Sequence, residues 1–192
     1  MRRVTSRAFA PRPRALAAAL ERAGTVVLLD PGCARALHQF APACGIALAP
    51  RLVHVSVYLR QRLARLRGAG VPAARRAGGL PRPVQPRGAT SGSTRRPRAL
   101  LQAAAGGKPP RELAQAREQA ACSGAGGVYR KIWPRFAGRI AARRLEEFDG
   151  AGAARLATAC PSCVRQLGRE RPPGTVVDVL ELLAEAMGLG PG

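Results

Sequence analysis

Apolar residues along this chain recur in two patterns, as short continuous runs and as stripes with helical spacing. The run at 25–30, T-V-V-L-L-D, is typical of a strand buried on both faces. Helices are predicted beside it over 15–23 and 34–40, and residues 52–55 form a second short strand candidate. Short apolar runs that alternate with helical segments predict an α/β fold with parallel strands.

The same alternation returns after residue 98. Helices are predicted over 99–105 and 111–121, and strands over 155–159 and 176–177. Between residues 68 and 98, glycine, proline and arginine are too dense for a packed element. That segment is therefore expected to be a flexible linker or loop.

Two further helices have recognisable start signals. Pro134 suits the first turn of a helix, and Asp178 can cap the last helix because Glu181 stands three residues later. The helix after Pro134 is expected to bury one face and to expose its charged residues. Its predicted buried face consists of Ala137, Ile140, Ala141, Leu145 and Phe148, and its predicted outward residues are Arg139, Arg143, Arg144 and Glu147.

The two ends of the chain resemble each other. When Cys33 is placed over Cys163, D-P-G-C-A-R-A-L lies on C-P-S-C-V-R-Q-L. Two pseudo-repeated Rossmann-like half-domains with short parallel strands and flanking helices are therefore expected, joined by a Gly/Pro/Arg-rich linker. The expected units are the tail of a first cysteine-rich repeat (1–67), the linker (68–98) and a second repeat (99–192). Sites in open parallel sheets lie beyond the carboxyl ends of strands, so both cysteine loops are expected to face one cleft.

The charge of the chain is strongly positive. A formal net charge of +21 and an isoelectric point near 11.8 would ordinarily indicate a polyanionic partner. The basic residues are almost all arginines scattered among Ala, Gly and Pro, as in a G+C-rich coding sequence. No basic face interleaved with aromatic residues is recognised, so a solvated surface is favoured over a specific nucleic-acid partner. No apolar run approaches the roughly 18 residues of a membrane span.

Cysteine usage bears on the compartment and the chemistry. The chain has five cysteines and no recognisable export signal, so a cytoplasmic location is expected. In a reducing compartment, neighbouring cysteines indicate metal or redox work rather than structural disulfides.

Three of the cysteines lie between residues 122 and 163. Cys160 and Cys163 form C-P-S-C, and Cys122 opens the glycine-rich loop C-S-G-A-G-G. This pattern indicates a metal, an iron–sulfur centre or a redox thiol. A thiol–disulfide pair, with Cys122 buried behind a tight turn and with Tyr129 and Trp133 as packing residues, is the competing interpretation.

The order and spacing of these motifs resemble the cysteine-rich CCG domain. That domain occurs twice in the B and D subunits of heterodisulfide reductase, and also in iron–sulfur subunits of glycolate oxidase, lactate-utilisation and anaerobic glycerol-3-phosphate dehydrogenase complexes. The matching residues are C-S-G-A-G-G at 122–127 and C-P-S-C at 160–163. The first copy is represented by Cys33 in D-P-G-C and lacks its N-terminal half, so a truncated chain is expected.

The resemblance implies a ligand set that this chain only partly retains. The implied metal ligands are Cys122, Cys160 and Cys163, with Cys33 available across the cleft, and Gly124, Gly126 and Gly127 would let the backbone approach the cofactor. Ser123 replaces the second cysteine of the family motif, and no cysteine stands near Thr90. A [4Fe–4S] cluster commonly takes four thiolates. Occupancy of the site is therefore left open.

Two functions follow from the resemblance. The first is a non-catalytic electron-transfer subunit or fragment of an oxidoreductase complex. This subunit would hold an iron–sulfur cluster, with a flavin-dependent dehydrogenase or another iron–sulfur subunit as partner and contact with a membrane only through the complex. The second is a degenerate CCG domain without a cluster, acting as a structural or interaction module. A basic nucleic-acid-binding protein is the third and least favoured interpretation.

Overall fold

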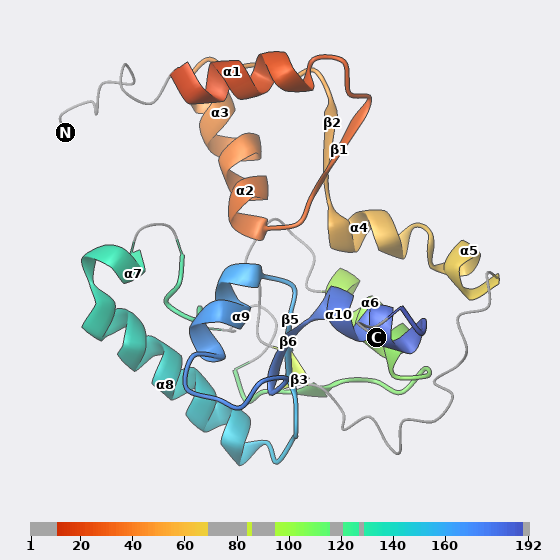
Figure 1. Ribbon diagram of the computed structural model, residues 1–192, viewed down its shortest axis with the longest axis vertical. Helices are drawn as coiled ribbons and strands as arrows, with labels where there is room; N and C mark the ends of the chain where they lie inside the picture. The colour runs from red at the N-terminus through yellow and green to blue at the C-terminus, as the bar shows by residue number, and fades with distance from the viewer. Residues whose placement is uncertain (1–10, 69–83, 86–94, 116–120, 127–128, 190–192) are drawn as a thin grey trace.

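Two parallel sheets organise the protein in the computed structural model (Figure 1). The structure describes residues 11–68, 84–85, 95–115, 121–126 and 129–189. The first sheet has two strands, β1 (Thr25–Leu28) and β2 (Arg51–His54), and the second has four strands in the order β4-β3-β5-β6. The predicted α/β class with short parallel strands is confirmed by these pairings.

The N-terminal part surrounds its two strands with short helices. They are α1 (Pro11–Leu20), α2 (Pro31–Arg35), the π-helical turn η1 (Ala36–Phe40), α3 (Ala41–Ala43), α4 (Val55–Arg60) and α5 (Leu63–Gly68). The strand β1 was predicted to be buried on both faces, and this is wrong because Val27 and Leu29 are exposed. With β2 as its partner, β1 lacks the cover on both faces that a central strand receives.

The four-stranded sheet consists of β3 (Val84–Gln85), β4 (Arg111–Glu112), β5 (Leu156–Thr158) and β6 (Val176–Asp178). Every neighbouring pair is parallel, and β3 and β5 are neighbours although β4 lies between them in the sequence. The direction in which strands are added therefore reverses between β3 and β5. In doubly wound sheets this switch point is where binding sites form.

Helices cover both faces of this sheet, and each face has its own core. On one side lie α8 (Pro134–Gly150) and α9 (Pro161–Leu167), and on the other lie α6 (Arg95–Ala104) and α10 (Val179–Ala186) (Figure 1). Leu156 and Cys160 of the β5 segment pack toward α8, whereas Ala157 and Ala159 pack toward α6 and α10. Side chains along β5 point alternately to the two faces of the sheet, and this places Cys160 on the face that α8 covers.

The two parts of the chain meet through α4. This helix packs against α6, and Leu59 and Leu63 lie against the core that contains Leu100 and Leu183. Both parts have the order strand–helix–strand–helix, but one carries a two-stranded sheet and the other a four-stranded sheet. Two equivalent Rossmann-like half-domains therefore stay a prediction, as do the proposed domain boundaries.

Two segments differ from their predicted structure. A helix over 111–121 is wrong at its start, because Arg111–Glu112 forms β4 after Pro109 and Pro110, and Glu112 is ion-paired with Arg98 of α6. Much of the predicted linker lies outside the described residues, but Val84–Gln85 within it forms β3 at the centre of the sheet.

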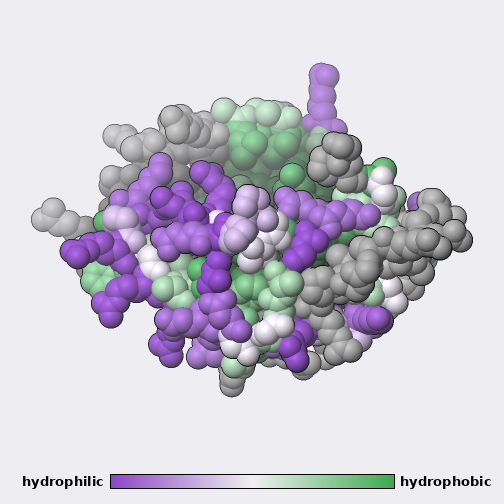
Figure 2. Space-filling view, turned by 60° about the horizontal axis from the view of Figure 1, so that its bottom comes forward, coloured by the Kyte–Doolittle hydropathy of each residue, from purple (hydrophilic) through white to green (hydrophobic). Residues whose placement is uncertain are grey.

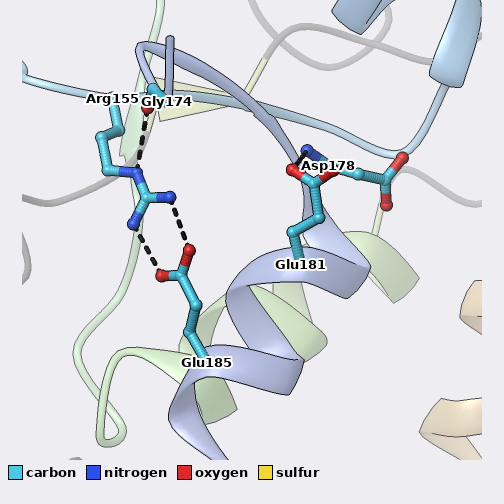
Figure 3. A network of polar contacts seen from close by, with 5 residues as sticks. All are labelled: Arg155, Gly174, Asp178, Glu181 and Glu185. Atoms are coloured by element: carbon cyan, nitrogen blue, oxygen red, sulfur yellow. Dashed lines mark hydrogen bonds and ion pairs between the residues drawn. The ribbon is translucent and has the colours of Figure 1, made fainter. Parts of the chain in front are cut away.

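Polar contacts fix the last helix at both ends (Figure 3). The side chain of Asp178 accepts from the backbone N–H of Leu180, and Glu181 accepts from that of Asp178, which confirms the predicted capping box. Arg155 donates from both terminal nitrogens to Glu185, at 2.8 and 2.9 Å, and from Nε to the Gly174 carbonyl. These contacts join the start of β5, the turn before β6 and α10.

Candidate metal or thiol centre

The C-P-S-C motif lies directly after β5, at the switch point of the sheet. Cys160 has extended backbone angles and is the N-cap residue of α9, and Pro161 occupies the first helical position. The backbone N–H of Cys163 donates to the carbonyl of Cys160 at 2.9 Å. Both side chains are buried, with 9% and 7% exposure. A strand end and one helical turn therefore bring two thiols together below the surface.

Ser123 contacts this pair from the glycine-rich loop. Its hydroxyl donates to Cys163 Sγ at 3.1 Å, and its side chain is 3% exposed. Thr158, the last residue of β5, is fully buried, its hydroxyl has no hydrogen-bond partner among the described residues, and its proximity helps to lower the pKa of Cys163. Cys163 is therefore surrounded by groups that can donate to its sulfur.

The pKa values of the two thiols shift in opposite directions. The hydrogen bond that Cys160 donates to Cys163 is the largest influence on both. It lowers the pKa of Cys163, helped by Ser123 and opposed by burial, and it raises the pKa of Cys160 together with burial. Cys163 is thus the sulfur that accepts negative charge first, and Cys160 is the proton donor of the pair.

Arg144 brings a positive charge to the same region from α8. The side chain is 1% exposed, and Nη1 donates to Glu147 at 2.6 Å and to the Gln115 carbonyl at 2.9 Å. Nε and Nη2 have no hydrogen-bond partner among the described residues. Burial lowers the pKa of Arg144, and the charges of Glu147 and Cys163 oppose that effect. Buried donors without partners are rare in proteins and suggest that this site receives another group.

The outward orientation predicted for Arg144 is therefore wrong. The buried face of α8 consists of Ala137, Ala141, Arg144, Leu145 and Phe148, whereas Ile140, predicted to be buried, is 37% exposed. The helical spacing alone predicts a buried position, because Arg144 stands three residues after Ala141 and four before Phe148. The charge of Arg144 was the reason why an orientation toward solvent was predicted instead.

The loop after β1 reaches the C-P-S-C motif. Asp30 Oδ1 caps α2 by accepting from the backbone N–H groups of Gly32 and Cys33, at 2.6 and 3.0 Å. Its other oxygen, Oδ2, lies 3.5 Å from the Ser162 hydroxyl. The charge of Asp30 also contributes to raising the pKa of Cys33 and of Cys160. This contact shows that the two loops are adjacent, and a shared cleft between them stays a prediction.

The predicted ligands are brought together only in part. Cys33 and Cys122 are exposed, and all five cysteines are free thiols. Cys122 lies close enough for its charge to oppose ionisation of Cys163. Within the described residues, no three His, Cys, Asp or Glu side chains converge closely enough to hold a metal ion.

The glycines of the loop differ in whether their surroundings leave room for a side chain. Gly124 has φ +79°, and a Cβ there would lie 2.9 Å from the Ala137 carbonyl oxygen. Its lack of a side chain lets the loop pack on α8. A Cβ on Gly126 would have no atom within 4 Å, and Gly127 lies outside the described residues. The cofactor-binding role of these glycines stays a prediction.

The donor chemistry around Cys160 and Cys163 can be tested against an iron–sulfur group. Two buried thiols, a third thiol at the rim and donors without partners around Cys163 suit a soft, anionic metal–sulfur group. Four thiolates on one centre are not assembled in the described part of the chain. The residues therefore fit such a group through Cys160 and Cys163, with further ligands to be brought in from the rim.

Comparison with known families identifies this part of the chain. Residues 94–168 match the sequence model of the CCG family, described as a cysteine-rich domain. The matched stretch contains the glycine-rich loop, α8 and the C-P-S-C motif, and covers less than half of the 192 residues. No curated protein matches the chain. No helix in the described ranges is long and apolar enough to cross a membrane. The family resemblance seen in the sequence is thus confirmed for residues 94–168, which match the CCG cysteine-rich domain.

Proposed function

We propose that this chain is an electron-transfer component of an oxidoreductase complex and holds an iron–sulfur group at the C-P-S-C motif. Cys160 and Cys163 would be the central ligands, Cys122 would join them from the glycine-rich loop, and Cys33 would reach the centre across the cleft. The group would supply one-electron redox chemistry. A flavin-dependent dehydrogenase or another iron–sulfur subunit in the cytoplasm would exchange electrons with it.

The observation that carries this proposal is the environment of Cys163. Its sulfur accepts from Ser123 at 3.1 Å and from Cys160, and it lies close enough to Arg144 for their charges to interact. Two nitrogens of Arg144 have no hydrogen-bond partner among the described residues. A site that stabilises a thiolate by several donors suits a metal-bound sulfur, because such contacts tune clusters and their ligands. The position at the switch point supports a binding role.

Anaerobic reconstitution with iron and sulfide tests the proposal. The wild-type chain is expected to become coloured, to retain iron and acid-labile sulfide after desalting, and to give an EPR signal on reduction. The double substitution of Cys160 and Cys163 by Ser should abolish all three. Cys44→Ser is the matched control, because Cys44 is an exposed thiol outside the C-P-S-C motif and the glycine-rich loop. A colourless, iron-free wild-type protein would refute the proposal.

A second function is favoured by one specific contact. Ser123 stands at a ligand position of the family motif, and its hydroxyl already satisfies Cys163. A domain that has lost its cluster and serves as a structural or interaction module would have this arrangement. In that case the Cys160/Cys163 double variant should match the wild type in unfolding temperature and in partner capture.

A further inference from the structure

An exposed apolar ridge follows the glycine-rich loop. It lies on α7 (Tyr129–Ile132) and the first half of α8, and it consists of Tyr129, Ile132, Trp133, Phe136 and Ile140. Trp133 and Phe136 are each 53% exposed, and their rings are arranged edge to face with centroids 6.2 Å apart. Tyr129 and Trp133 were predicted to be packing residues, but the structure leaves both exposed.

This ridge is an exception on a hydrophilic surface. Hydrophilic residues cover much of the face turned forward in Figure 2, as expected of a chain with a net charge of +21. Single exposed apolar side chains need no explanation, but a continuous row of them marks an interaction site. The cavity beside α8, of about 1020 Å³, is lined from the other side of the helix by Pro134, Gly138 and Ala142. The ridge is therefore an outward-facing surface and not a wall of that cavity.

A row of arginines runs along α8 beside the ridge. Arg139 stands three residues after Phe136, and Arg143 stands three after Ile140, so the members of each pair are neighbours on the helix surface. Arg135 extends the row toward the start of the helix, and all three arginines are exposed. The salt bridges found among the described residues do not involve them. No Asp or Glu occurs between residues 121 and 145. This side of α8 is therefore both apolar and cationic.

We propose that the ridge and the arginine row bind directly to the surface of an anionic lipid bilayer. Helices that lie in the bilayer interface combine Trp and Phe with basic residues, because the rings enter the head-group region while the cations meet lipid phosphates. Arginine stems are long enough to reach these phosphates while the neighbouring ridge is buried. A second copy of the chain fits this surface less well, because two such faces would bring like charges together.

The proposed contact is separate from the redox role. It is direct, rather than only through a partner subunit, and it uses none of the cysteines. It can therefore be tested on the chain whether or not a metal group is bound.

Trp133 reports on this contact, because it is the only tryptophan in the chain. Vesicles of phosphatidylcholine and phosphatidylglycerol should shift its emission to shorter wavelength, since the indole leaves water for the interface. Lipids brominated on the acyl chains should quench the emission, which charge attraction to the head groups alone would not cause. Vesicles of phosphatidylcholine alone should bind at least about tenfold more weakly, because each arginine gains from the anionic surface. An unchanged spectrum with the anionic vesicles would overturn the proposal.

A matched pair of phenylalanine variants tests the ridge. Phe136→Ala is compared with Phe40→Ala, because Phe40 is exposed to nearly the same extent, 51% against 53%, in the N-terminal part. Co-sedimentation with the anionic vesicles should show about fivefold weaker binding for Phe136→Ala, through lost apolar burial, and no change for Phe40→Ala. Light scattering without lipid examines self-association. A wild-type dimer that Phe136→Ala abolishes, together with no vesicle binding, would identify a second copy as the occupant and overturn the proposal.

Two charge-matched variants separate the arginine row from the general basic character of the chain. One replaces Arg135, Arg139 and Arg143 by Ala. The other replaces three exposed arginines of the N-terminal part by Ala, namely Arg22, Arg51 and Arg65. The first should bind the anionic vesicles about tenfold more weakly or worse, and the second should lose less than about threefold. Equal losses in the two variants would overturn the proposal. Circular dichroism checks that every variant is folded.

Discussion

The Ser123 hydroxyl donates a hydrogen bond of 3.1 Å to Cys163 Sγ, between two residues that are 40 positions apart. This contact ties the glycine-rich loop to the first turn of α9. The loop also supplies Cys122, so the contact determines how near the rim thiol lies to the buried pair. The geometry of the centre therefore depends on a residue that is not itself a thiol.

Replacing Ser123 by Cys should strengthen metal binding. A third thiol would then stand directly against Cys163, and soft metals bind more tightly as thiolates are added. After anaerobic reconstitution, iron and sulfide per chain should rise above the wild-type values. Ser162→Cys is the matched control, because it adds a thiol at an exposed position of the C-P-S-C motif. An equal rise in both variants would contradict a specific role for position 123.

Replacing Gly124 by Ala should destabilise the protein by about 2 kcal/mol or more. The positive φ disfavours any residue with a Cβ, and this Cβ would lie too close to the backbone of Ala137. Gly126→Ala has neither problem and should change the free energy of unfolding by less than about 0.5 kcal/mol. Urea unfolding of the two variants side by side measures the difference. Equal stability of both would show that the loop does not need this close packing.

Replacing Arg144 by Met should destabilise the metal-free protein by about 2–4 kcal/mol, because Glu147 and the Gln115 carbonyl lose their partner. Arg143→Met, at the neighbouring exposed position, should cost less than about 0.5 kcal/mol. Thermal and urea unfolding give both values.

Reconstitution of the same two variants separates stability from binding. If the two nitrogens of Arg144 that lack a partner among the described residues serve the bound group, Arg144→Met should retain less iron per folded chain than Arg143→Met does. Equal retention would restrict Arg144 to a structural role.

The ion pair between Arg155 and Glu185 should make stability depend on acid pH. Arg155 lowers the pKa of Glu185, so this contribution is present above the ordinary pKa of a glutamate, about 4.3. It is lost as the pH falls through the lower pKa of the folded state. Because the pair is partly exposed, we expect Glu185→Gln to cost about 0.5 kcal/mol at pH 7.

The difference between wild type and Glu185→Gln should therefore disappear in strong acid. Urea unfolding at neutral pH and near pH 3 measures it, with Glu146→Gln as the exposed control on α8. A constant difference across this range would show that the pair does not act through its charges.

Local signals predicted much of the C-terminal half. Pro134, the capping box of Asp178 and the apolar runs at β5 and β6 each mark an element whose interactions are close in the sequence. In contrast, β3 and β4 are two residues long, and their pairing depends on distant partners rather than on a periodic pattern. No sequence rule recognises strands of that length.

The site was predicted as a set of residue types, and its geometry was not. Cys160 and Cys163 were predicted from the C-P-S-C spacing at the end of an apolar run and from the family resemblance. The structure buries both side chains, and their role as ligands stays a prediction. Arg144 was missed because its charge outweighed its position on the apolar face of α8. The roles of Ser123 and Asp30 depend on contacts across 40 and 132 positions, which spacing along the chain does not reveal.

The alternation of side chains along β5 also sets a limit on how this domain can vary. Leu156 and Cys160 face α8, while Ala157 and Ala159 face α6 and α10. An insertion or deletion of one residue between Leu156 and Cys160 would turn the thiol toward the opposite core, away from Ser123 and Arg144. The number of residues in this segment is therefore as restricted as their identity. Insertions and deletions in the loop after α9 should be tolerated more readily.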